Sequence, residues 1–374
     1  MRIDKNTTIR LGDRNIVKVK IGDSVIWQKE PDYFYVENTY DGNNTISVKQ
    51  TITGSPDSST YAKHLQYSKD KTNWSTITLS STAYTITLNK GEKVYFRGNE
   101  GVLNYYANDG AIKTITNILG TQTHTIGGNI NTLVNYITPN ELTLPQGVFA
   151  ELFQKNTTIT SAENLTLQPS SDGSLSSYCY LYLFKNCTNL TTVPQSIPAK
   201  KQGQDACNGM FAYTAITTAP TLPATTLSNG CYYSLFEGCT SLVNAPQLPA
   251  TEMKPNCYRS LFFGCTSLVN APELPATTLA EGCYRSLFNG CTSLTTAPDL
   301  LAPTLVGYCY AYLFNACTSL NSVKCTATSG VGSNNSTVEW LWNVSPTGTF
   351  TKESGVTWET GVSGIPSGWT IVNS

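Results

Sequence analysis

The sequence predicts a β-rich protein in three parts, of which the last and longest is a solenoid of stacked repeats. Two observations predict it: one pattern recurs at steps of 26 residues in the second half of the chain, and alternating runs of strand length fill the part before it. The chain has 374 residues, which is more than one ordinary core organises, but stacked repeats need no single large core because each packs only on its neighbours.

The first 30 residues contain two similar segments, 11–17 and 21–27, and each has a Gly-Asp pair near its start. Short apolar runs with Gly-Asp turns predict two short strands, and hence an N-terminal β-hairpin over 1–30. A hairpin this small is marginal in water by itself, so its apolar side chains are expected to pack on the next domain or to dock on another chain. The side chains concerned are those of Ile16, Val25, Ile26 and Trp27.

Residues 31–120 have the regular alternation of strand and turn signals that is typical of a small antiparallel β-sandwich. The spacing predicts an immunoglobulin-like fold with Trp74 in its core, and no disulfide closes it because the first cysteine is Cys179. The strand-like runs are 33–36, 45–51, 84–88 and 93–96, and the turn signals lie at 41–44, 54–57 and 89–92.

The solenoid is expected over 121–374, with a C-terminal cap from about 335. The segment from Cys231 to Leu242 recurs from Cys257, from Cys283 and, with changes, from Cys309, so the step is 26 residues each time. Seven or eight coils result. Each is marked by a Leu-Phe pair or its equivalent: Leu152-Phe153, Leu183-Phe184, Met210-Phe211, Leu235-Phe236, Leu261-Phe262, Leu287-Phe288, Leu313-Phe314 and an altered last pair, Leu341-Trp342.

Each coil is expected to have two sides. On one side the segment Leu-x-x-Ala-Pro-x-Leu-Pro, as over 242–249, is extended because its prolines disfavour helix, and it predicts one parallel strand per coil. On the other side Cys231, Leu235 and Cys239 are spaced by four residues, so they share one face of a short helix or of a succession of tight turns. A unit of this length and composition lies within the range of leucine-rich repeats.

The unit C-Y-x-S-L-F-x-G-C-T-S-L-x-x-A-P-x-L-P-A-T-x-L resembles the leucine-rich repeats of BspA-like proteins over about 150–374. The segment from Thr347 to Trp369 looks like the closing segment of such arrays. The family occurs in surface proteins of gut and oral anaerobes and in proteins of the phages that infect them, so the resemblance implies adhesion and ligand binding without chemistry. The N-terminal hairpin is similar to short N-terminal segments of phage tail proteins, which implies docking onto a particle.

Composition argues against several classes of partner. The net charge is -1, so no global field draws the chain to nucleic acid or to anionic lipid. No apolar stretch is long enough for a membrane span, and none after Met1 reads as a secretory signal, so we expect a soluble protein made in the cytosol.

The twelve cysteines and two histidines do not have the spacing of a metal site or a catalytic triad, and no cofactor motif is present. Within a unit the cysteines are separated by 7 residues and between units by 17, unlike the close pairs of zinc sites. Their periodic placement favours buried free thiols that act as small apolar residues, while the expected spacing of stacked coils leaves disulfides open.

The strand side is the expected binding face, because solenoid curvature makes an extended concave surface there. Its hydroxyl, amide and carboxylate side chains either bind a glycan or host protein or are ordinary solvated positions. On the opposite side a row of tyrosines follows the first cysteine of five units and fits either an interface or packing between coils. These are Tyr180, Tyr232, Tyr258, Tyr284 and Tyr310. The expected binding residues are Thr192, Thr218, Asn244, Asn270, Thr296, Gln247, Glu273 and Asp299.

The preferred hypothesis is a non-enzymatic phage virion protein of the tail, a fibre or another appendage. It docks on other virion proteins through its N-terminal region and presents the solenoid to a glycan or protein of the host surface; assembly into a trimer is left open. One alternative is a bacterial cell-surface adhesin. Another is a glycan-active enzyme that uses Glu273 and Asp299, which is disfavoured because other coils carry Gln195, Thr221 and Gln247 at the same position.

Overall fold

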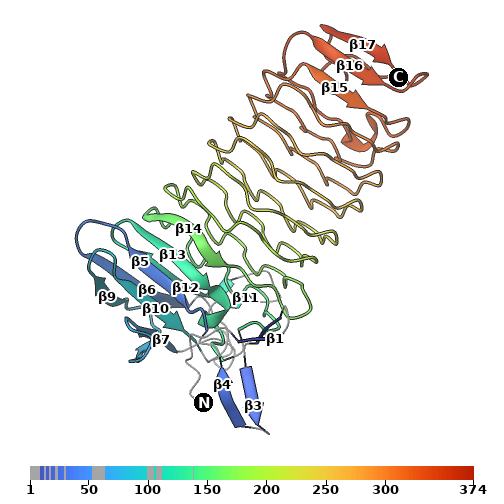
Figure 1. Ribbon diagram of the computed structural model, residues 1–374. Helices are drawn as coiled ribbons and strands as arrows, with labels where there is room; N and C mark the ends of the chain where they lie inside the picture. The colour runs from blue at the N-terminus through green and yellow to red at the C-terminus, as the bar shows by residue number, and fades with distance from the viewer. Residues whose placement is uncertain are drawn as a thin grey trace.

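The computed structural model describes residues 31–52, 64–98, 115–137 and 139–374, and the backbone alone of 9–11, 14–16, 18–21, 24–28, 105–106 and 112–114. The fold is β-rich, as predicted, with several sheets, none of them closed. The helical elements within these ranges are two short 3₁₀ turns, η1 (Ile130–Leu133) and η2 (Ser333–Asn335). Figure 1 shows strands gathered at the N-terminal end, a long stack of irregular coils, and three strands at the far end.

The N-terminal segment forms two antiparallel ladders where a single hairpin was expected. Strand β1 (Ile9–Leu11) pairs with β2 (Arg14–Ile16), and β3 (Lys18–Ile21) pairs with β4 (Ser24–Gln28). Gly12-Asp13 separates β1 from β2, and Gly22-Asp23 separates β3 from β4. Each of the two similar segments therefore belongs to its own ladder. The Gly-Asp turns themselves lie outside the described residues.

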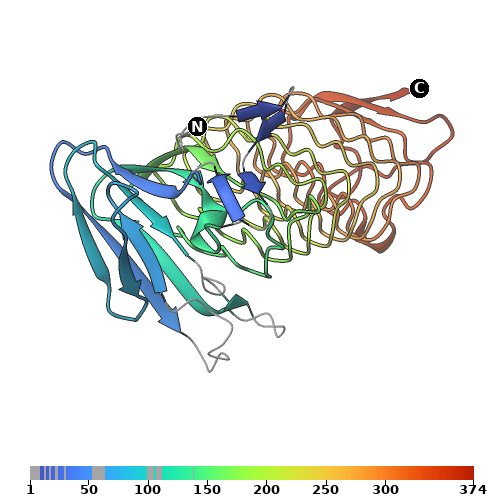
Figure 2. The ribbon, with the colours of Figure 1, turned by 60° about the horizontal axis from the view of Figure 1, so that its bottom comes forward.

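Two sheets follow, and Figure 2 shows their strands grouped at the N-terminal end of the stack. Apolar side chains of both sheets contribute to one core. Along β5 and β10 every second residue is buried, as expected for strands with one face on a core. Phe34, Val94 and Phe96 from one sheet and Ile46 and Ile86 from the other fill the space. One sheet includes β5 (Phe34–Asn38), β10 (Lys93–Arg97), β7 (His64–Ser68) and β8 (Ser75–Thr78); the other has β11 (Tyr105–Tyr106), β12 (Ile112–Gly120), β6 (Asn44–Ile52) and β9 (Tyr84–Leu88).

The prediction that Trp74 lies in this core is wrong. Side chains alternate between the two faces of a strand, and Trp74 is three residues before the buried Ile77, so it lies on the opposite face. There the indole is half-buried, with the guanidinium of Arg97 3.9 Å above its ring and the ring of Tyr33 4.9 Å away. Its Nε1 donates to the carbonyl oxygen of Lys71 at 2.9 Å.

One sheet joins this region to the repeats. Strand β13 (His124–Asn129) pairs antiparallel with β5 on one side and parallel with β14 (Ile159–Thr166) on the other, which gives a six-stranded sheet in the order β14-β13-β5-β10-β7-β8. The apolar core is also continuous, because the ring of Phe34 stacks 5.7 Å from that of Phe153 in the first repeat. The two regions therefore share a sheet and a core.

The cysteine side of each repeat is a succession of tight turns, and not the short helix that was the other expectation. Tyr233 N–H donates to Gly230 O in its own coil at 2.9 Å, whereas Ser234 N–H donates to Arg259 O of the next coil at 2.9 Å, and this alternation continues along the segment. Every fourth residue has a positive φ, with values of 61° at Gly230, 54° at Ser234 and 69° at Gly238. Gly230 and Ser234 are the third residues of turns closed by Cys231 N–H to Ser228 O and by Leu235 N–H to Tyr232 O, where a type II turn requires a positive φ. We call this side the turn side.

The opposite side, which we call the strand side, lacks the strand that was expected in each coil. Between β14 and β15, all of which is described, neighbouring coils meet there through isolated parallel bridges such as Thr218 to Asn244 and Asn244 to Asn270. The Ala-Pro-x-Leu-Pro segments supply the reason, since each proline lacks the N–H that a ladder needs. Parallel strands form where the proline pairs end: β15 (Ser322–Cys325), β16 (Gly348–Lys352) and β17 (Trp369–Asn373).

Aromatic rings stack through the interior of the coils in two columns. The phenylalanines from Phe153 to Phe314 lie 5.3–5.9 Å from one another, and the tyrosines from Tyr232 to Tyr310 lie 5.8–6.2 Å apart. Trp340 extends the tyrosine column at 6.4 Å and Trp358 follows at 5.1 Å. These contacts are all between equivalent or terminal positions, so each coil completes its core against its neighbours.

The last coil is displaced by one residue from the prediction. Phe314 N–H donates to Trp340 O, just as Phe288 N–H donates to Leu313 O, so Trp340 takes the place of the leucine in the Leu-Phe pair. Leu341 is buried in the second position, whereas Trp342 is 52% exposed. The repeat interval lengthens after Cys309, and the Leu-Trp pair was therefore matched one residue too late.

Candidate binding face

The structure brings the first predicted row of side chains together along the strand side. Thr218, Asn244, Asn270 and Thr296 are exposed, and Thr192 is half-buried. Some of their hydrogen-bonding capacity is used between coils, since Asn270 Nδ2 donates to Asn244 Oδ1 at 2.7 Å and Thr192 Oγ1 donates to Ser161 Oγ at 2.6 Å. The row thus contributes to the stacking of the coils and also faces solvent.

The second row, three residues further along each coil, carries the charge. Gln247, Glu273 and Asp299 are all exposed and occupy the same position in three successive coils. Asp299 accepts a hydrogen bond from the ammonium of Lys324 at 2.6 Å, and this bond raises the pKa of Lys324. Glu273 has no ion-pair partner in the part of the chain that the structure describes.

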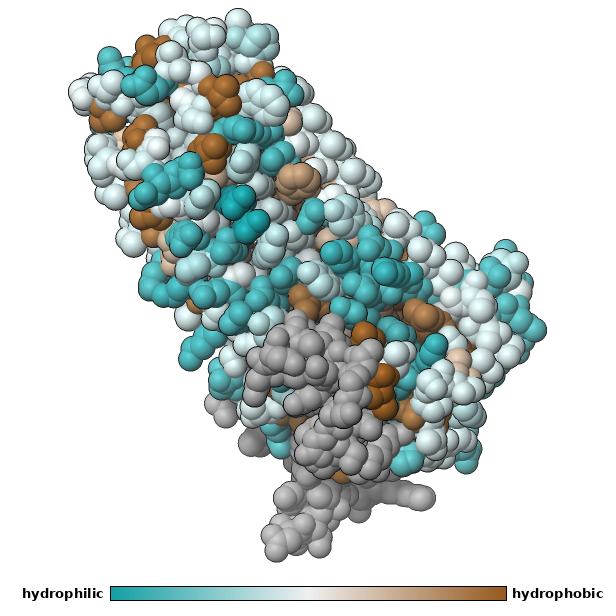
Figure 3. All heavy atoms as spheres, turned by 180° about the vertical axis from the view of Figure 1, so that it is seen from behind, coloured by the Kyte–Doolittle hydropathy of each residue, from teal (hydrophilic) through white to brown (hydrophobic). Residues whose placement is uncertain are grey.

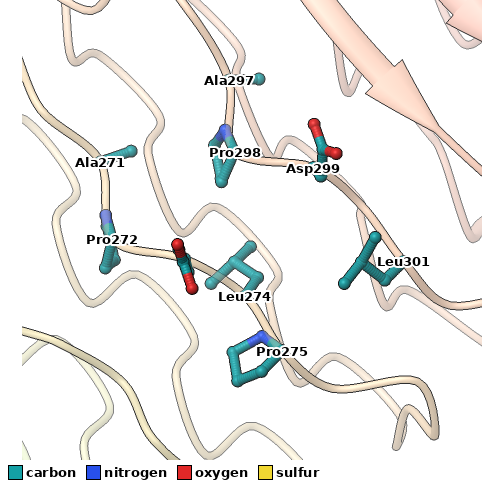
Figure 4. Close-up of a pocket in the computed structure, with 9 residues that line it drawn as sticks. Ala271, Pro272, Leu274, Pro275, Ala297, Pro298, Asp299 and Leu301 are labelled. Carbon is teal, nitrogen blue, oxygen red and sulfur yellow. The ribbon is translucent and has the colours of Figure 1, made fainter.

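Glu273 and Asp299 line one open pocket of about 470 Å³. The first comes from the coil that also supplies Pro272, Leu274 and Pro275, and the second comes from the next coil. Figure 4 shows the two segments running side by side, with the carboxylate of Asp299 directed away from Pro298. The other lining residues are Ala271, Ala297, Pro298 and Leu301, so seven of the nine lining residues are proline, alanine or leucine.

Sequence reasoning found the two carboxylates of this pocket but not its apolar wall. The signal is present in the sequence, because Leu301 stands where earlier coils have Pro249 and Pro275. Leu301 is 39% exposed, which makes it an apolar side chain turned partly to solvent. The role of Lys324 was also missed, since it depends on which residue of the next coil lies beside Asp299.

No family model, curated protein or solved structure matches this chain. Within the described ranges, no helix is long and apolar enough to cross a membrane.

The turn side is built differently. The five tyrosines that directly follow a cysteine, from Tyr180 to Tyr310, are at most 1% exposed, so they pack between coils and are not available to a partner. Outside them, half-buried arginines lie over other tyrosines: Arg259 is 5.1 Å from the ring of Tyr233, and Arg285 is 5.3 Å from that of Tyr308. Seen from behind, the molecule has a largely polar surface on which hydrophobic residues stand in small separate groups (Figure 3).

All twelve cysteines are buried free thiols, in agreement with the prediction that they act as apolar interior residues. The second cysteine of a unit has a specific partner: Cys265 Sγ donates to Phe236 O of the preceding coil at 3.1 Å, and Cys291 Sγ donates to Phe262 O in the same way. Burial raises the pKa of Cys239 to about 11 and that of Cys257 to about 12, which keeps both protonated near neutral pH. Among the described residues no group of three histidine, cysteine or acidic side chains is placed to hold a metal ion.

The expected docking residues belong to the N-terminal ladders. Ile16 is the last residue of β2, and Val25, Ile26 and Trp27 lie within β4. Their side chains lie outside the described residues, so their contacts stay a prediction.

Proposed function

We propose that this protein is a non-enzymatic recognition protein of a bacteriophage virion, and that its repeat stack binds a component of the host surface. In this proposal the stack is a leucine-rich-repeat solenoid of the kind found in BspA-like proteins. The two sheets before it form an immunoglobulin-like sandwich, and the N-terminal ladders dock on other virion proteins. The protein is then located on the surface of the particle.

The observation that carries the proposal is the contrast between the interior and the strand side of the stack. Interior positions repeat the same residue types from coil to coil, because each side chain packs on its equivalent in the next coil. The outward position occupied by Gln247, Glu273 and Asp299 changes in every coil and remains exposed. A fixed scaffold with a variable outer row is what a binding surface requires, and curved repeat arrays commonly use such surfaces.

A non-enzymatic role agrees with the state of the two carboxylates. Glycoside hydrolysis by a pair of carboxylates requires one of them to stay protonated, which enzymes achieve by placing it in an apolar, desolvated site. Glu273 and Asp299 are both exposed, and Asp299 is bound by Lys324. A binding pocket makes no such demand on its acidic groups.

The test combines location with binding. Mass spectrometry of purified particles should detect this chain as a virion component, and the purified chain should bind host cells in a saturable manner. A double variant, Asn244→Ala with Asn270→Ala, should weaken that binding, whereas Glu359→Gln, an exposed change near the C-terminal end, should leave it unchanged. Detection only in the envelope fraction of a bacterium would contradict the virion location and favour a cell-surface adhesin.

A further inference from the structure

The pocket between the two coils that carry Glu273 and Asp299 differs in its lining from an ordinary polar surface. Its volume, about 470 Å³, lies within the range of small-ligand sites. Seven of its nine lining residues are alanine, proline or leucine, and the other two are carboxylates. The lining side chains therefore offer an apolar wall and negative charge, and little else.

This lining disfavours a neutral sugar. Carbohydrate hydroxyls need several hydrogen-bond donors and acceptors, and flat sugar faces pack well on aromatic rings. None of the nine lining residues has a hydroxyl group, an amide side chain or an aromatic ring. Pro272, Pro275 and Pro298 also lack a backbone N–H, so this part of the wall offers a sugar no backbone donor.

Among the described residues, the negative charge of the pocket is only partly balanced. The carboxylate of Asp299 is neutralised by the ammonium of Lys324 at 2.6 Å. That of Glu273 is exposed and has no ion-pair partner among the described residues. One negative charge beside an apolar wall therefore remains for a ligand.

We propose that this pocket binds a lysine side chain of an extended peptide segment, so that the proteinaceous part of the host surface is recognised here. The four-carbon stem of lysine lies along the proline and leucine wall, and its ammonium pairs with Glu273. Lysine combines an apolar stem with a compact terminal charge, which matches the two features of the pocket. The inference rests on the proposed function, since it names the class of ligand for part of the same binding face.

The structure offers a conservative variant for the test. Glu273→Gln introduces the residue that the preceding coil already has at this position, Gln247, so the variant should fold normally. Glu281→Gln removes the same charge from another exposed position outside the pocket lining and serves as the matched control.

The probe is the peptide acetyl-Ala-Lys-Ala-amide, titrated into the full chain and followed by calorimetry and by ligand-observed NMR. We expect one site per chain, with an affinity that falls by about fivefold or more in Glu273→Gln, because a contact between unit charges is lost, and that is unchanged in Glu281→Gln. Acetylation of the lysine Nζ should abolish binding, and added salt should weaken it.

Equal affinity of the acetylated peptide, or an unchanged affinity of Glu273→Gln, would overturn the inference, as would tighter binding of chitooligosaccharides at the same pocket. Failure of the peptide to bind while host-cell binding persists overturns the lysine site alone. Loss of host-cell binding by the whole chain, with peptide binding intact, overturns the proposed function and leaves the lysine site standing.

Discussion

Replacing Phe262 by alanine tests whether the phenylalanine column holds the coils together. Its ring lies 5.7 Å from the rings of both Phe236 and Phe288, and its side chain is fully buried. Truncation removes stacking on two sides and leaves a cavity that neither neighbouring ring can fill without moving its own coil. Phenylalanine-to-alanine changes in such cores cost about 3–5 kcal/mol in the free energy of unfolding, and we expect Phe262→Ala to fall within this range.

The adjacent residue provides the control. Phe263 is the same residue type in the same coil, but its side chain is 39% exposed, and Phe263→Ala should cost about 1 kcal/mol or less. Urea unfolding followed by tryptophan fluorescence suits this comparison, because Trp74 lies beside the first sheets and four tryptophans, from Trp340 to Trp369, lie at the C-terminal end of the stack. Repeat arrays gain stability from contacts between neighbouring units, so the damaged coil should also separate the transitions of the two ends.

Equal losses in the two variants would refute the reasoning, since they would mean that the stack does not depend on its buried column. A larger loss in Phe263→Ala would do the same. A single sharp transition in Phe262→Ala with unchanged stability would show that the coils on either side are coupled by other contacts.

Three further predictions follow from the coil geometry and the buried titratable groups. Gly238→Ala should destabilise the protein more than Gly264→Ala, because both residues have a φ of 69° but only at Gly238 would a Cβ collide with a ring, that of Tyr213; paired urea midpoints check this. The twelve thiols should be almost unreactive to a disulfide reagent at pH 8 in the folded protein and fully reactive in urea, and rapid reaction of several thiols without denaturant would contradict their burial. Burial lowers the pKa of His124 below its ordinary value of 6.5. As the pH falls through 6.5 the unfolded chain therefore binds a proton at this histidine more readily than the folded chain does, and the free energy of unfolding should fall. In His124→Gln the fall between pH 7.5 and pH 5 should be smaller.

Periodicity predicted most of the repeat region because the same side chain must pack on its equivalent in every coil. The buried positions of Cys231, Leu235 and Cys239 followed from their spacing alone. The strand expected in each coil is missing between β14 and β15, because the prolines that make the segment extended also remove the N–H donors that a ladder requires. Local patterns failed where the repeat interval changes, at Trp340, and where a single aromatic residue had to be assigned to one of two faces, at Trp74.

The sequence predicted which residues line up along the candidate site, but it did not predict the pocket between them. Equivalent spacing places Gln247, Glu273 and Asp299 in one line, and the structure has them so. The pocket arises from differences between coils, such as Leu301 in place of a proline, and the ion pair arises from Lys324 one coil further on. Contacts between unlike residues of adjacent coils leave no periodic signal, so a single sequence does not reveal them.

The alternation of backbone hydrogen bonds on the turn side has a consequence for how such a chain can change its length. Each coil donates backbone N–H groups to carbonyl groups of the next coil at equivalent positions, as Ser234 does to Arg259 and Ser260 does to Arg285. A duplication or deletion of one 26-residue unit by unequal recombination would therefore leave the new junction between coils bonded in register. The far end would move by about 4.8 Å for each unit gained or lost, the spacing of adjacent strands, so reach could be adjusted in small steps while both termini stay the same.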